Sequence, residues 1–412
     1  MPVLVMKFGG TSVANLDRIR RAAKRIGVEV AKGYDVIVIV SAMAGKTNEL
    51  VGWVNETSPF FDAREYDAVV SSGENVTAGL MALTLQEMGV PARSWQGWQV
   101  PLLTTSAHSA ARIEDIPTTN ISQKFGEGMR VAVVAGFQGL SPEGRITTLG
   151  RGGSDTTAVA FAAAFQAERC DIYTDVDGVY TTDPRVCEKA RKLENISFEE
   201  MLELASLGAK VLQTRSVELA MRYKVKLRVL SSFEEQSDTA GTLVVDEEEI
   251  MESNVVSGVA FSRDEAKMTV VSVLDRPGVA ATIFTGLSDA GVNVDMIVQN
   301  VSEEGITDMT FSCPTDQVTR AERAMRDAAE KGELEFEDVL IDYDVCKVSV
   351  VGIGMRSQSG VAARMFQVLS QEGINIKVIT TSEIKISVLI DRKYMELAVQ
   401  ALHDAFELDK AS

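Results

Sequence analysis

The sequence contains few of the side chains from which metal centres and disulfide frameworks are built. Its 412 residues include four cysteines and two histidines. The cysteines form no Cys-x-x-Cys pair, and His108 and His403 lie far apart along the chain. We therefore expect neither a disulfide framework nor a zinc site, and the cysteine usage fits a reducing cytoplasm.

Long hydrophobic runs are also absent. The longest apolar stretches, such as residues 158–165, are far shorter than a membrane-spanning helix. At the N-terminus a charge appears at Lys7, before an apolar signal segment could form. We expect neither export nor a membrane anchor, so the predicted location is the cytoplasm.

Basic residues are outnumbered by acidic ones, 41 to 59, which gives a formal net charge of −18. Such an excess repels phosphate backbones and anionic membranes, so nucleic acid and membrane surfaces are poor candidate partners. Hydrophobic residues make up 45% of the chain and charged residues 24%, as in ordinary soluble proteins. The length suggests two or three domains.

The first 250 residues alternate between predicted strands and helices. Buried strands are predicted at 3–8, 35–40, 131–135, 170–174, 225–230 and 242–245, and an amphipathic helix at about 14–31. This alternation predicts an α/β fold with a mostly parallel sheet covered by helices. The acidic run 246–249 reads as a solvated connection, and we place a domain boundary there.

Two helix starts carry capping signals. Ser154 precedes Asp155 and an apolar run, which predicts an N-cap at Ser154. Ser197 and Glu200 have the spacing of a capping box, with Gly208 near the end of that helix.

The remainder of the chain contains an internal repeat. The segment Gly-Val-Ala-Ala at 278–281 recurs at 360–363, and each copy is followed at equal spacing by Phe, Leu, Ser and Gly. Strands are predicted before each copy, at 268–274 and 347–352, and after each glycine, beginning at 292 and 374. Each copy therefore reads as a ferredoxin-like βαββαβ unit.

Two glycine pairs stand at predicted helix starts. Lys7 precedes Gly9-Gly10, and Arg151 precedes Gly152-Gly153. Glycines let backbone amides approach an anion at a helix N-terminus, and the flanking cations favour the same ligand. Each segment is also compatible with an ordinary βα turn, but two in one parallel-sheet domain favour binding.

Two apparent nucleotide motifs do not fit their patterns. Gly45-Lys46-Thr47 resembles the end of a Walker A motif, but Val40 stands where that motif requires glycine. Gly352-Ile353-Gly354 lacks the third glycine of a dinucleotide fingerprint, because Ser357 occupies its place. Any nucleotide is therefore held in another way.

The segment 174–185 offers a further candidate site. Acidic residues and a glycine lead to Tyr180 and then Arg185. Such a loop suits an adenine against Tyr180 and a phosphate at Arg185, and a hydrogen-bonded Asx turn explains the acidic residues equally well.

Together these motifs resemble the aspartate kinase family. The resemblance rests on KFGGTS at 7–12, SAMAGKTNEL at 41–50, SSGE at 71–74, GFQG at 136–139, TTLGRGGSDTTA at 147–158, YTDVDGVYTTDPR at 173–185, SFEEMLELASLGAKVL at 197–212, QNVS at 299–302 and TSEIKISVLI at 381–390. It covers essentially the whole chain. The repeats resemble ACT domains, which bind amino acids.

The resemblance implies an amino-acid kinase fold at 1–247, a linker at 248–262, and ACT domains at 263–340 and 341–412. It implies transfer of the ATP γ-phosphoryl group to the side-chain carboxylate of L-aspartate, the first step towards lysine, threonine, methionine and diaminopimelate. ATP with Mg²⁺ is the expected nucleotide substrate. No tightly bound metal, organic cofactor or homoserine dehydrogenase segment is expected.

The resemblance also assigns site residues. The catalytic pair would be Lys7 and Asp155. ATP would be bound by Lys7, Gly9, Gly10, Ser41, Thr174, Asp175, Tyr180, Arg185 and Lys210. Aspartate would be bound by Thr47, Glu74, Arg151, Gly152 and Ser154. Family members often carry Val or Ile where Lys46 stands, so Lys46 receives no role.

These residue types suit the implied chemistry. A carboxylate nucleophile with a reference pKa near ~3.9 is already ionised at neutral pH and needs no general base. Its repulsion from the triphosphate has to be overcome, and Lys7 with glycine amides can stabilise the transferred charge. Asp155 would hold Lys7 or the metal, Arg151 would pair with the α-carboxylate, and Glu74 with the α-ammonium.

For regulation the resemblance implies feedback by lysine, threonine or both, at an interface between ACT domains of two chains. The helix start after 275–277 can receive a carboxylate at its amides, and polar side chains on the next strand suit an ammonium. The expected effector residues are Asp275, Gly278, Val279, Ala280, Asn293, Asp295, Gln299, Asn300, Asn375, Ile376, Thr381 and Ser382. Met251 could start a separate regulatory chain.

Two other functions remain open on sequence alone. One is a different enzyme of this fold, such as a glutamate, N-acetylglutamate or uridylate kinase. The other is an amino-acid sensor with a vestigial kinase domain, against which the intact Lys7, Arg151 and Asp155 argue.

Overall fold

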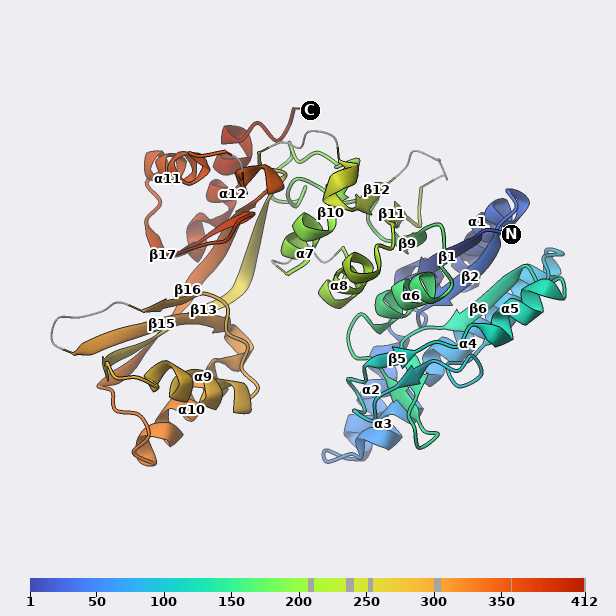
Figure 1. The fold of residues 1–412 in the computed structure, drawn as a ribbon, viewed down its shortest axis with the longest axis horizontal. Helices are drawn as coiled ribbons and strands as arrows, with labels where there is room; N and C mark the ends of the chain where they lie inside the picture. Colours follow the sequence, from blue (N-terminus) through green and yellow to red (C-terminus); the bar gives the residue numbers. More distant parts are fainter. Residues whose placement is uncertain (207–210, 235–240, 251–254, 300–304, 357, 411–412) are drawn as a thin grey trace. The chain divides into compact units, whose positions relative to one another are not determined.

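The computed structural model describes residues 1–206, 211–234, 241–250, 255–299, 305–356 and 358–410. These residues form two compact units (Figure 1). The first unit holds the described residues of 1–179, 192–206 and 210–251, and the second holds residues 180–191 and those described after 252. Gly208 and Met251 lie outside the described residues.

The first unit alternates strands and helices, as the sequence predicts. Its elements are β1 (Val3–Phe8), α1 (Leu16–Ala31), β2 (Asp35–Val40), α2 (Lys46–Thr57), α3 (Ala63–Val70), α4 (Ser72–Glu87), β3 (Ala92–Trp95), β4 (Leu103–Thr104), β5 (Ile113–Asp115), α5 (Thr119–Gly126), β6 (Val131–Ala135), β7 (Gln138–Leu140), β8 (Ile146–Thr148), α6 (Gly153–Ala164), β9 (Cys170–Thr174), β10 (Asn195–Ser197), α7 (Phe198–Ser206), α8 (Thr214–Tyr223), β11 (Leu227–Ser231) and β12 (Thr242–Val245).

The main sheet of this unit has the strand order β10-β12-β11-β9-β1-β2-β6-β3. All neighbouring strands run parallel except β11 and β12, so the predicted mostly parallel sheet is confirmed. The sequence did not reveal the small sheet β5-β4-β7-β8, whose strands have two or three residues each. The predicted capping box is present, because the amide of Glu200 donates to Ser197 Oγ and the amide of Ser197 donates to the Glu200 carboxylate.

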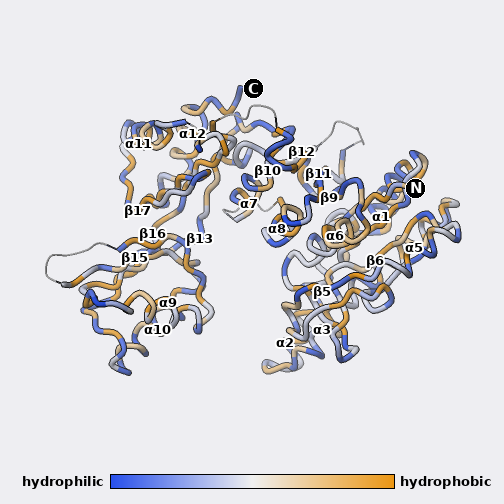
Figure 2. The backbone as a smooth tube through the Cα atoms, viewed as in Figure 1, coloured by the Kyte–Doolittle hydropathy of each residue, from blue (hydrophilic) through white to orange (hydrophobic). Residues whose placement is uncertain are grey.

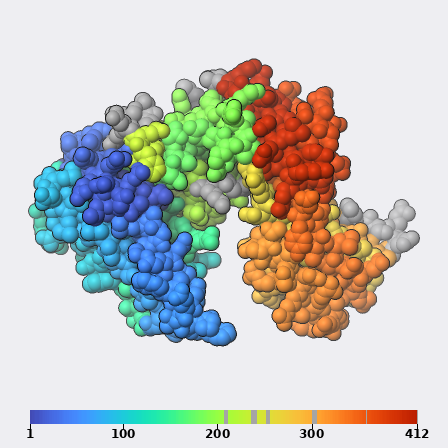
Figure 3. Space-filling model, turned by 180° about the vertical axis from the view of Figure 1, so that it is seen from behind, coloured from blue at the N-terminus to red at the C-terminus, as the bar shows by residue number. Residues whose placement is uncertain are grey.

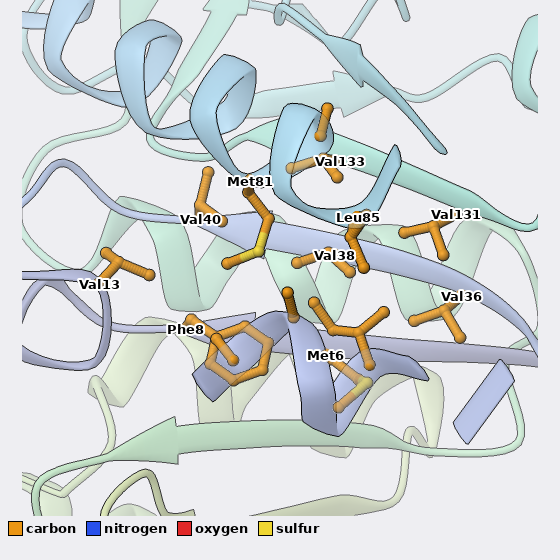
Figure 4. Packing of buried hydrophobic residues seen from close by; sticks show 14 of the residues in the cluster. Met6, Phe8, Val13, Val36, Val38, Val40, Met81, Leu85, Val131 and Val133 are labelled. Atoms are coloured by element: carbon orange, nitrogen blue, oxygen red, sulfur yellow. The ribbon is translucent and has the colours of Figure 1, made fainter. Parts of the chain in front are cut away.

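Alternate residues of the central strands face opposite sides of the sheet. Met6 and Phe8 of β1 pack with Val38 of β2 and with Met81 of α4 in one buried cluster (Figure 4). Because side chains alternate along a strand, Lys7 points to the other face, where α6 contacts β1, β2 and β9. The hydrophobic pattern of β1 thereby directs its one cation towards α6.

A buried ionic cluster ties β9 to its neighbours. Asp171 is fully buried and accepts two hydrogen bonds from Arg228 of β11, at 3.0 and 2.8 Å. Arg169 donates to Asp171 at 2.9 Å, and its guanidinium also pairs with Glu29 of α1 at 3.4 Å. Asp171 is paired with both arginines, and Arg169 with both Asp171 and Glu29. The cluster therefore fixes the alignment of β9 against β11 and α1.

The second unit is built from the repeats and the segment 180–191. Its elements are β13 (Gly258–Leu274), α9 (Val279–Asp289), β14 (Ile297–Gln299), β15 (Ile306–Pro314), α10 (Val318–Glu330), β16 (Asp338–Val351), α11 (Val361–Gln371), β17 (Ile376–Thr381), β18 (Lys385–Asp391) and α12 (Met395–Ala405).

The strands of this unit form one sheet of order β14-β15-β13-β16-β18-β17. Its long strands β13 and β16 carry both hydrophobic and hydrophilic residues (Figure 2), and each serves both repeats. The second repeat takes its fourth strand from 258–262, which precedes the first repeat in sequence. Residues 258–262 were predicted as linker, but Val259 belongs to the core of the second repeat because it packs there with Val348 and Val388.

The first repeat also differs from prediction after α9. A strand was predicted from residue 292, but β14 begins at Ile297. The amide of Asn293 is bonded to the Gln317 side chain, and the amide of Val292 to the carbonyl oxygen of Leu287. These bonds take donors that a sheet ladder would need. In the space-filling view this repeat forms the orange surface and the second repeat the red one (Figure 3).

The segment 180–191 is anchored to α12. Buried Thr181 shares a hydrogen bond of 2.9 Å with His403, which is itself fully buried, and burial lowers the pKa of His403. Lys189 pairs with Asp404 at 2.8 Å. A single boundary after residue 247 therefore does not describe the contacts completely, because this earlier segment packs with the second repeat.

Among the described residues, no helix is long and apolar enough to cross a membrane.

Replacing Asp171 by Asn should destabilise the first unit, because Arg228 then loses its buried counter-charge. We expect a loss of about 3 kcal/mol in the free energy of unfolding, measured in urea. Glu249→Gln is the matched control, since Glu249 pairs with Lys226 at an exposed position and should contribute less than about 1 kcal/mol. Equal losses in the two variants would contradict this interpretation.

Candidate active site

The predicted catalytic pair forms a buried ion pair. Lys7, near the end of β1, contacts Asp155, in the first turn of α6, through its ammonium and the carboxylate oxygen Oδ1. Their side chains are 11% and 12% exposed. The contact with Asp155 fixes the position of the Lys7 ammonium at the carboxyl end of the central strand.

Two glycines follow β1 and lie close to this cation and to the end of β2. A Cβ atom at Gly9 would lie 3.5 Å from Lys7 Nζ, and one at Gly10 would lie 3.0 Å from the carbonyl oxygen of Ala42. Gly9 also donates its amide to the carbonyl oxygen of Tyr173, the last residue but one of β9. The turn after β1 is therefore held between the ends of β2 and β9, with Gly9 next to the ammonium.

The start of α6 is set by glycine rather than by serine. Gly152 is the N-cap with φ of +69°, so the prediction that Ser154 caps this helix is wrong. A side chain at Gly152 would be strained at that φ and would also collide with Gln213. Ser154 lies one residue into the helix and packs against Gly136, where a Cβ would approach its Oγ to 2.8 Å.

Glu74 lies buried at the start of α4, close to the same strand ends. Its Oε1 accepts the amide of Ala42 at 3.0 Å, and Ala42 follows β2 by two residues. Burial raises the pKa of Glu74 to about 7, and the Ala42 amide offsets part of that effect. Within the described residues its Oε2 is buried without a partner, which suits an incoming ammonium group.

Arg151 is exposed on the loop between β8 and α6. Gly150 and Gly152 on either side of it have φ of +76° and +69°. Thr47, predicted with it to bind the substrate, lies half-buried in the first turn of α2. Ala42, Lys46 and Leu50 all approach Gly73 at the start of α4, so the beginnings of α2 and α4 adjoin the end of β2.

Side chains that the sequence analysis missed hold the Arg151 loop. Fully buried Asp67 of α3 accepts hydrogen bonds from Thr148 at 2.6 Å and from the Ser109 amide at 3.1 Å, and it also contacts His108. Arg215 of α8 donates to the carbonyl oxygen of Leu149 at 2.8 Å. In the sequence His108 is notable only as one of two histidines, and no local pattern links it to Asp67.

The predicted nucleotide residues fall into different parts of the chain. Ser41 follows β2, Thr174 ends β9 and Asp175 follows it, with a hydrogen bond of 3.1 Å between the side chains of Thr174 and Asp175. Tyr180 and Arg185 belong to the second unit, where Arg185 pairs with Asp183 at 2.7 Å. Lys210 lies outside the described residues.

The predicted effector residues lie in two groups within one chain. Asp275 and the start of α9 follow the end of β13 at Leu274, whereas Asp295 contacts the Lys347 side chain, which also pairs with Glu265. Nine residues of strand separate Glu265 from Leu274, which is roughly 30 Å. A single amino acid cannot reach both groups in one chain.

The other effector residues divide in the same way. Asn375 and Ile376 are at the beginning of β17, where Ile376 is level with Ile390, whereas Thr381 and Ser382 are at its end. Gln299 ends β14, and Asn293 precedes it. Asn300 lies outside the described residues.

Within the described residues, the first unit thus gathers an ammonium, backbone amides of the glycine turn and a buried carboxylate with one unpartnered oxygen at the carboxyl ends of parallel strands, where ligands of open α/β sheets bind. The ammonium and the amides suit phosphate, and the carboxylate suits an amine. Among the described residues, no group of three or more His, Cys, Asp or Glu side chains could hold a metal ion. A magnesium ion that arrives with a nucleotide needs few protein ligands, since phosphates and water supply the others.

Comparisons with known proteins agree with this arrangement. The amino acid kinase family matches residues 2–231, and ACT domains match residues 267–330 and 348–406. An aspartokinase of Pseudomonas aeruginosa is 53% identical over 409 residues, covering 99% of this chain and 98% of that protein. An aspartokinase of Geobacillus stearothermophilus is 48% identical with the same coverage.

Among solved structures, aspartokinase III of E. coli in complex with aspartate and ADP, in the R-state, is similar with a TM-score of 0.80. It is 27% identical and covers 98% of this chain and 99% of its own. The same enzyme in complex with lysine and aspartate, in the T-state, gives a TM-score of 0.76 with the same identity and coverage.

Replacing Arg215 by Met should loosen the loop that carries Arg151, because two carbonyl oxygens, of Leu149 and Ala111, lose their donor. We expect amide hydrogen exchange at residues 147–152 to become about tenfold faster or more, as local opening costs less. Arg222→Met, at an exposed site on the same helix, should leave that exchange unchanged. Equal protection in both variants would contradict the role of Arg215.

Proposed function

Because this chain belongs to the aspartate kinase family, with an amino acid kinase domain and two ACT domains, we propose that it transfers the ATP γ-phosphoryl group to the side-chain carboxylate of L-aspartate. The product would be 4-phospho-L-aspartate. This reaction supplies the biosynthesis of lysine, threonine, methionine and diaminopimelate. The protein would act in the cytoplasm.

The observation that carries this proposal is the buried Lys7–Asp155 pair beside the glycine turn. A kinase whose nucleophile is already an anion needs positive charge at the transferred group rather than a base. Lys7 supplies that charge, and Asp155 fixes the position of the ammonium. The amide of Gly10 would add a hydrogen bond to the phosphates, whereas that of Gly9 donates to the carbonyl oxygen of Tyr173.

Magnesium enters as part of the nucleotide substrate and neutralises phosphate charge. The strands β2 and β9 flank β1. Ser41 follows β2, Thr174 ends β9 and Asp175 follows it, so these residues are suited to bind the nucleotide from the same sheet edge. Tyr180, Arg185 and Lys210 are assigned to the nucleotide by resemblance alone.

Aspartate would be recognised by groups that match its charges. The free Oε2 of Glu74 would accept the α-ammonium, and Arg151 would pair with the α-carboxylate. Thr47, Gly152 and Ser154 would complete the site at the starts of α2 and α6. Lys46 is exposed and pairs with Glu49, so we assign it no role.

We further propose feedback inhibition by lysine, threonine or both at the ACT domains. Lysine is present in the T-state structure of the E. coli enzyme, which supports an effector of that kind here. Since the effector residues of one chain lie in two groups, a site between ACT domains of two chains would account for their separation. A homo-oligomer follows from this proposal, and a separate regulatory chain starting at Met251 stays a prediction.

Replacing Lys7 by Ala should lower kcat by about 10²- to 10³-fold or more, because the charge on the transferred group loses its fixed cation. The KM for aspartate should change little, since Lys7 is not assigned to that substrate. Lys46→Ala is the matched control and should keep normal turnover. A Lys7→Ala variant with near-normal kcat would remove Lys7 from the mechanism.

The raised pKa of Glu74 predicts a pH dependence. Its carboxyl group is protonated below pH 7 and binds an ammonium only when ionised. We expect kcat/KM for aspartate to rise about tenfold between about pH 6 and about pH 8, and Glu74→Gln to abolish this rise. At saturating aspartate the KM for ATP serves as the control and should not share the profile. An unchanged profile in Glu74→Gln would exclude this role.

Initial rates measured with lysine and threonine, added singly and together, should show inhibition by at least one of these additions. Each effector would stabilise a less active state by binding it more tightly. Norvaline, an amino acid of similar size without the side-chain ammonium or hydroxyl, is the control. No inhibition in any combination would contradict the regulatory proposal.

A further inference from the structure

Three ionised side chains meet where the two repeats join. The ammonium of Lys347 lies 2.8 Å from the Glu265 carboxylate and also contacts the carboxylate of Asp295. The side chains of Lys347 and Glu265 are 6% and 8% exposed, whereas that of Asp295 is 46% exposed. Solvent therefore reaches this cluster mainly at Asp295.

The three residues come from different elements that are each fixed independently. Glu265 and Lys347 lie on the shared strands β13 and β16. Asp295 precedes β14, and its amide donates to the carbonyl oxygen of Ser312 at 3.1 Å. The next residue, Met296, is buried with Leu389 of the second repeat. The contact of Lys347 with Asp295 thus joins the first repeat to the second.

The cluster carries one positive and two negative charges. Burial opposes the charge of Lys347, but Glu265 and Asp295 more than offset it and raise the pKa of the ammonium. The ammonium is therefore fully charged at neutral pH. The cluster has a net charge of −1 and is exposed at Asp295, which favours a cation from solvent. The Asp295 carboxylate, however, is already paired with the ammonium of Lys347.

We propose that Lys347 is a built-in competitor for Asp295, so that an amino-acid effector with a side-chain ammonium binds there by displacing the Lys347 ammonium from this carboxylate. This inference rests on the proposed regulation of the chain by amino acids. Lys347 then sets the concentration at which such an effector acts, because each binding event breaks one ion pair as it forms another.

Glu265 makes the exchange feasible. When Lys347 leaves Asp295, its ammonium keeps the Glu265 carboxylate at 2.8 Å, so no charge becomes buried without a partner. An amino acid with an uncharged side chain cannot form a new ion pair with Asp295 to replace the one with Lys347. The cluster therefore selects cationic effectors, and their binding releases a contact between the two repeats.

The test compares the full-length protein with the double variant Lys347→Met/Glu265→Gln, which removes one positive and one negative charge and leaves Asp295 open. Isothermal titration calorimetry is run with L-lysine and with L-norleucine, which has the same carbon chain without the ammonium. We expect the dissociation constant for L-lysine to fall by about fivefold, since no ion pair has to be broken. The affinity for L-norleucine should not increase.

Two further variants act as controls. Lys377→Met/Asp342→Asn removes another lysine–carboxylate pair of the second unit and should leave the affinity for L-lysine unchanged. Asp295→Asn should weaken L-lysine binding in the wild-type background and in the double variant.

The outcomes test the competitor role of Lys347 separately from the proposed regulation by amino acids. If wild-type protein binds L-lysine and the double variant binds it no more tightly, the competitor role of Lys347 is wrong while the proposed regulation stands. If neither protein binds L-lysine, the choice of a cationic effector fails and the competitor role with it. Tighter binding of L-norleucine as well would show a general loosening of the fold, which also overturns the proposal.

Discussion

The ion pair between Lys7 and Asp155 is the contact on which the rest of the active site depends. Both side chains are largely buried, so removing one partner would leave the other as an uncompensated buried group. The pair joins the central strand to α6, and the glycine turn and the Arg151 loop extend from these two elements. A shift of either element would separate the fixed cation from the amides beside it.

The sheet explains why these groups meet. Strands β2, β1 and β9 are parallel neighbours, so their carboxyl ends, followed by Ser41, Gly9 and Asp175, lie along one edge. Alternation along β1 sends Phe8 into the core and Lys7 towards α6. The two-residue alternation of side chains along β1 thus determines both its packing and the position of its cation. The buried Asp171–Arg228 pair keeps β9 in place beside it.

The sequence predicted the elements with strong local signals and missed those set by distant contacts. The strands at 3–8 and 35–40 are apolar except for Lys7 and Asp35, and the Ser197–Glu200 box is a local pattern, so both were predictable. The N-cap at Gly152 depends on its positive φ, which the sequence does not show, and Ser154 nearby is a more usual capping residue. The fourth strand of the second repeat at 258–262, and the bonds of Asp67, join segments far apart in the chain, which periodicity cannot reveal.

The two proposals invoke the same kind of interaction: for catalysis a lysine held against one carboxylate, and for regulation a lysine held between two. The central claim is that the chain phosphorylates L-aspartate. The most direct measurement is ADP formation from ATP with L-aspartate, with L-glutamate and without acceptor, together with capture of the acyl phosphate by hydroxylamine. We predict ADP and hydroxamate in equal amounts with L-aspartate and neither above background without it. ADP formation that does not depend on L-aspartate, or no ADP at all, would contradict the account.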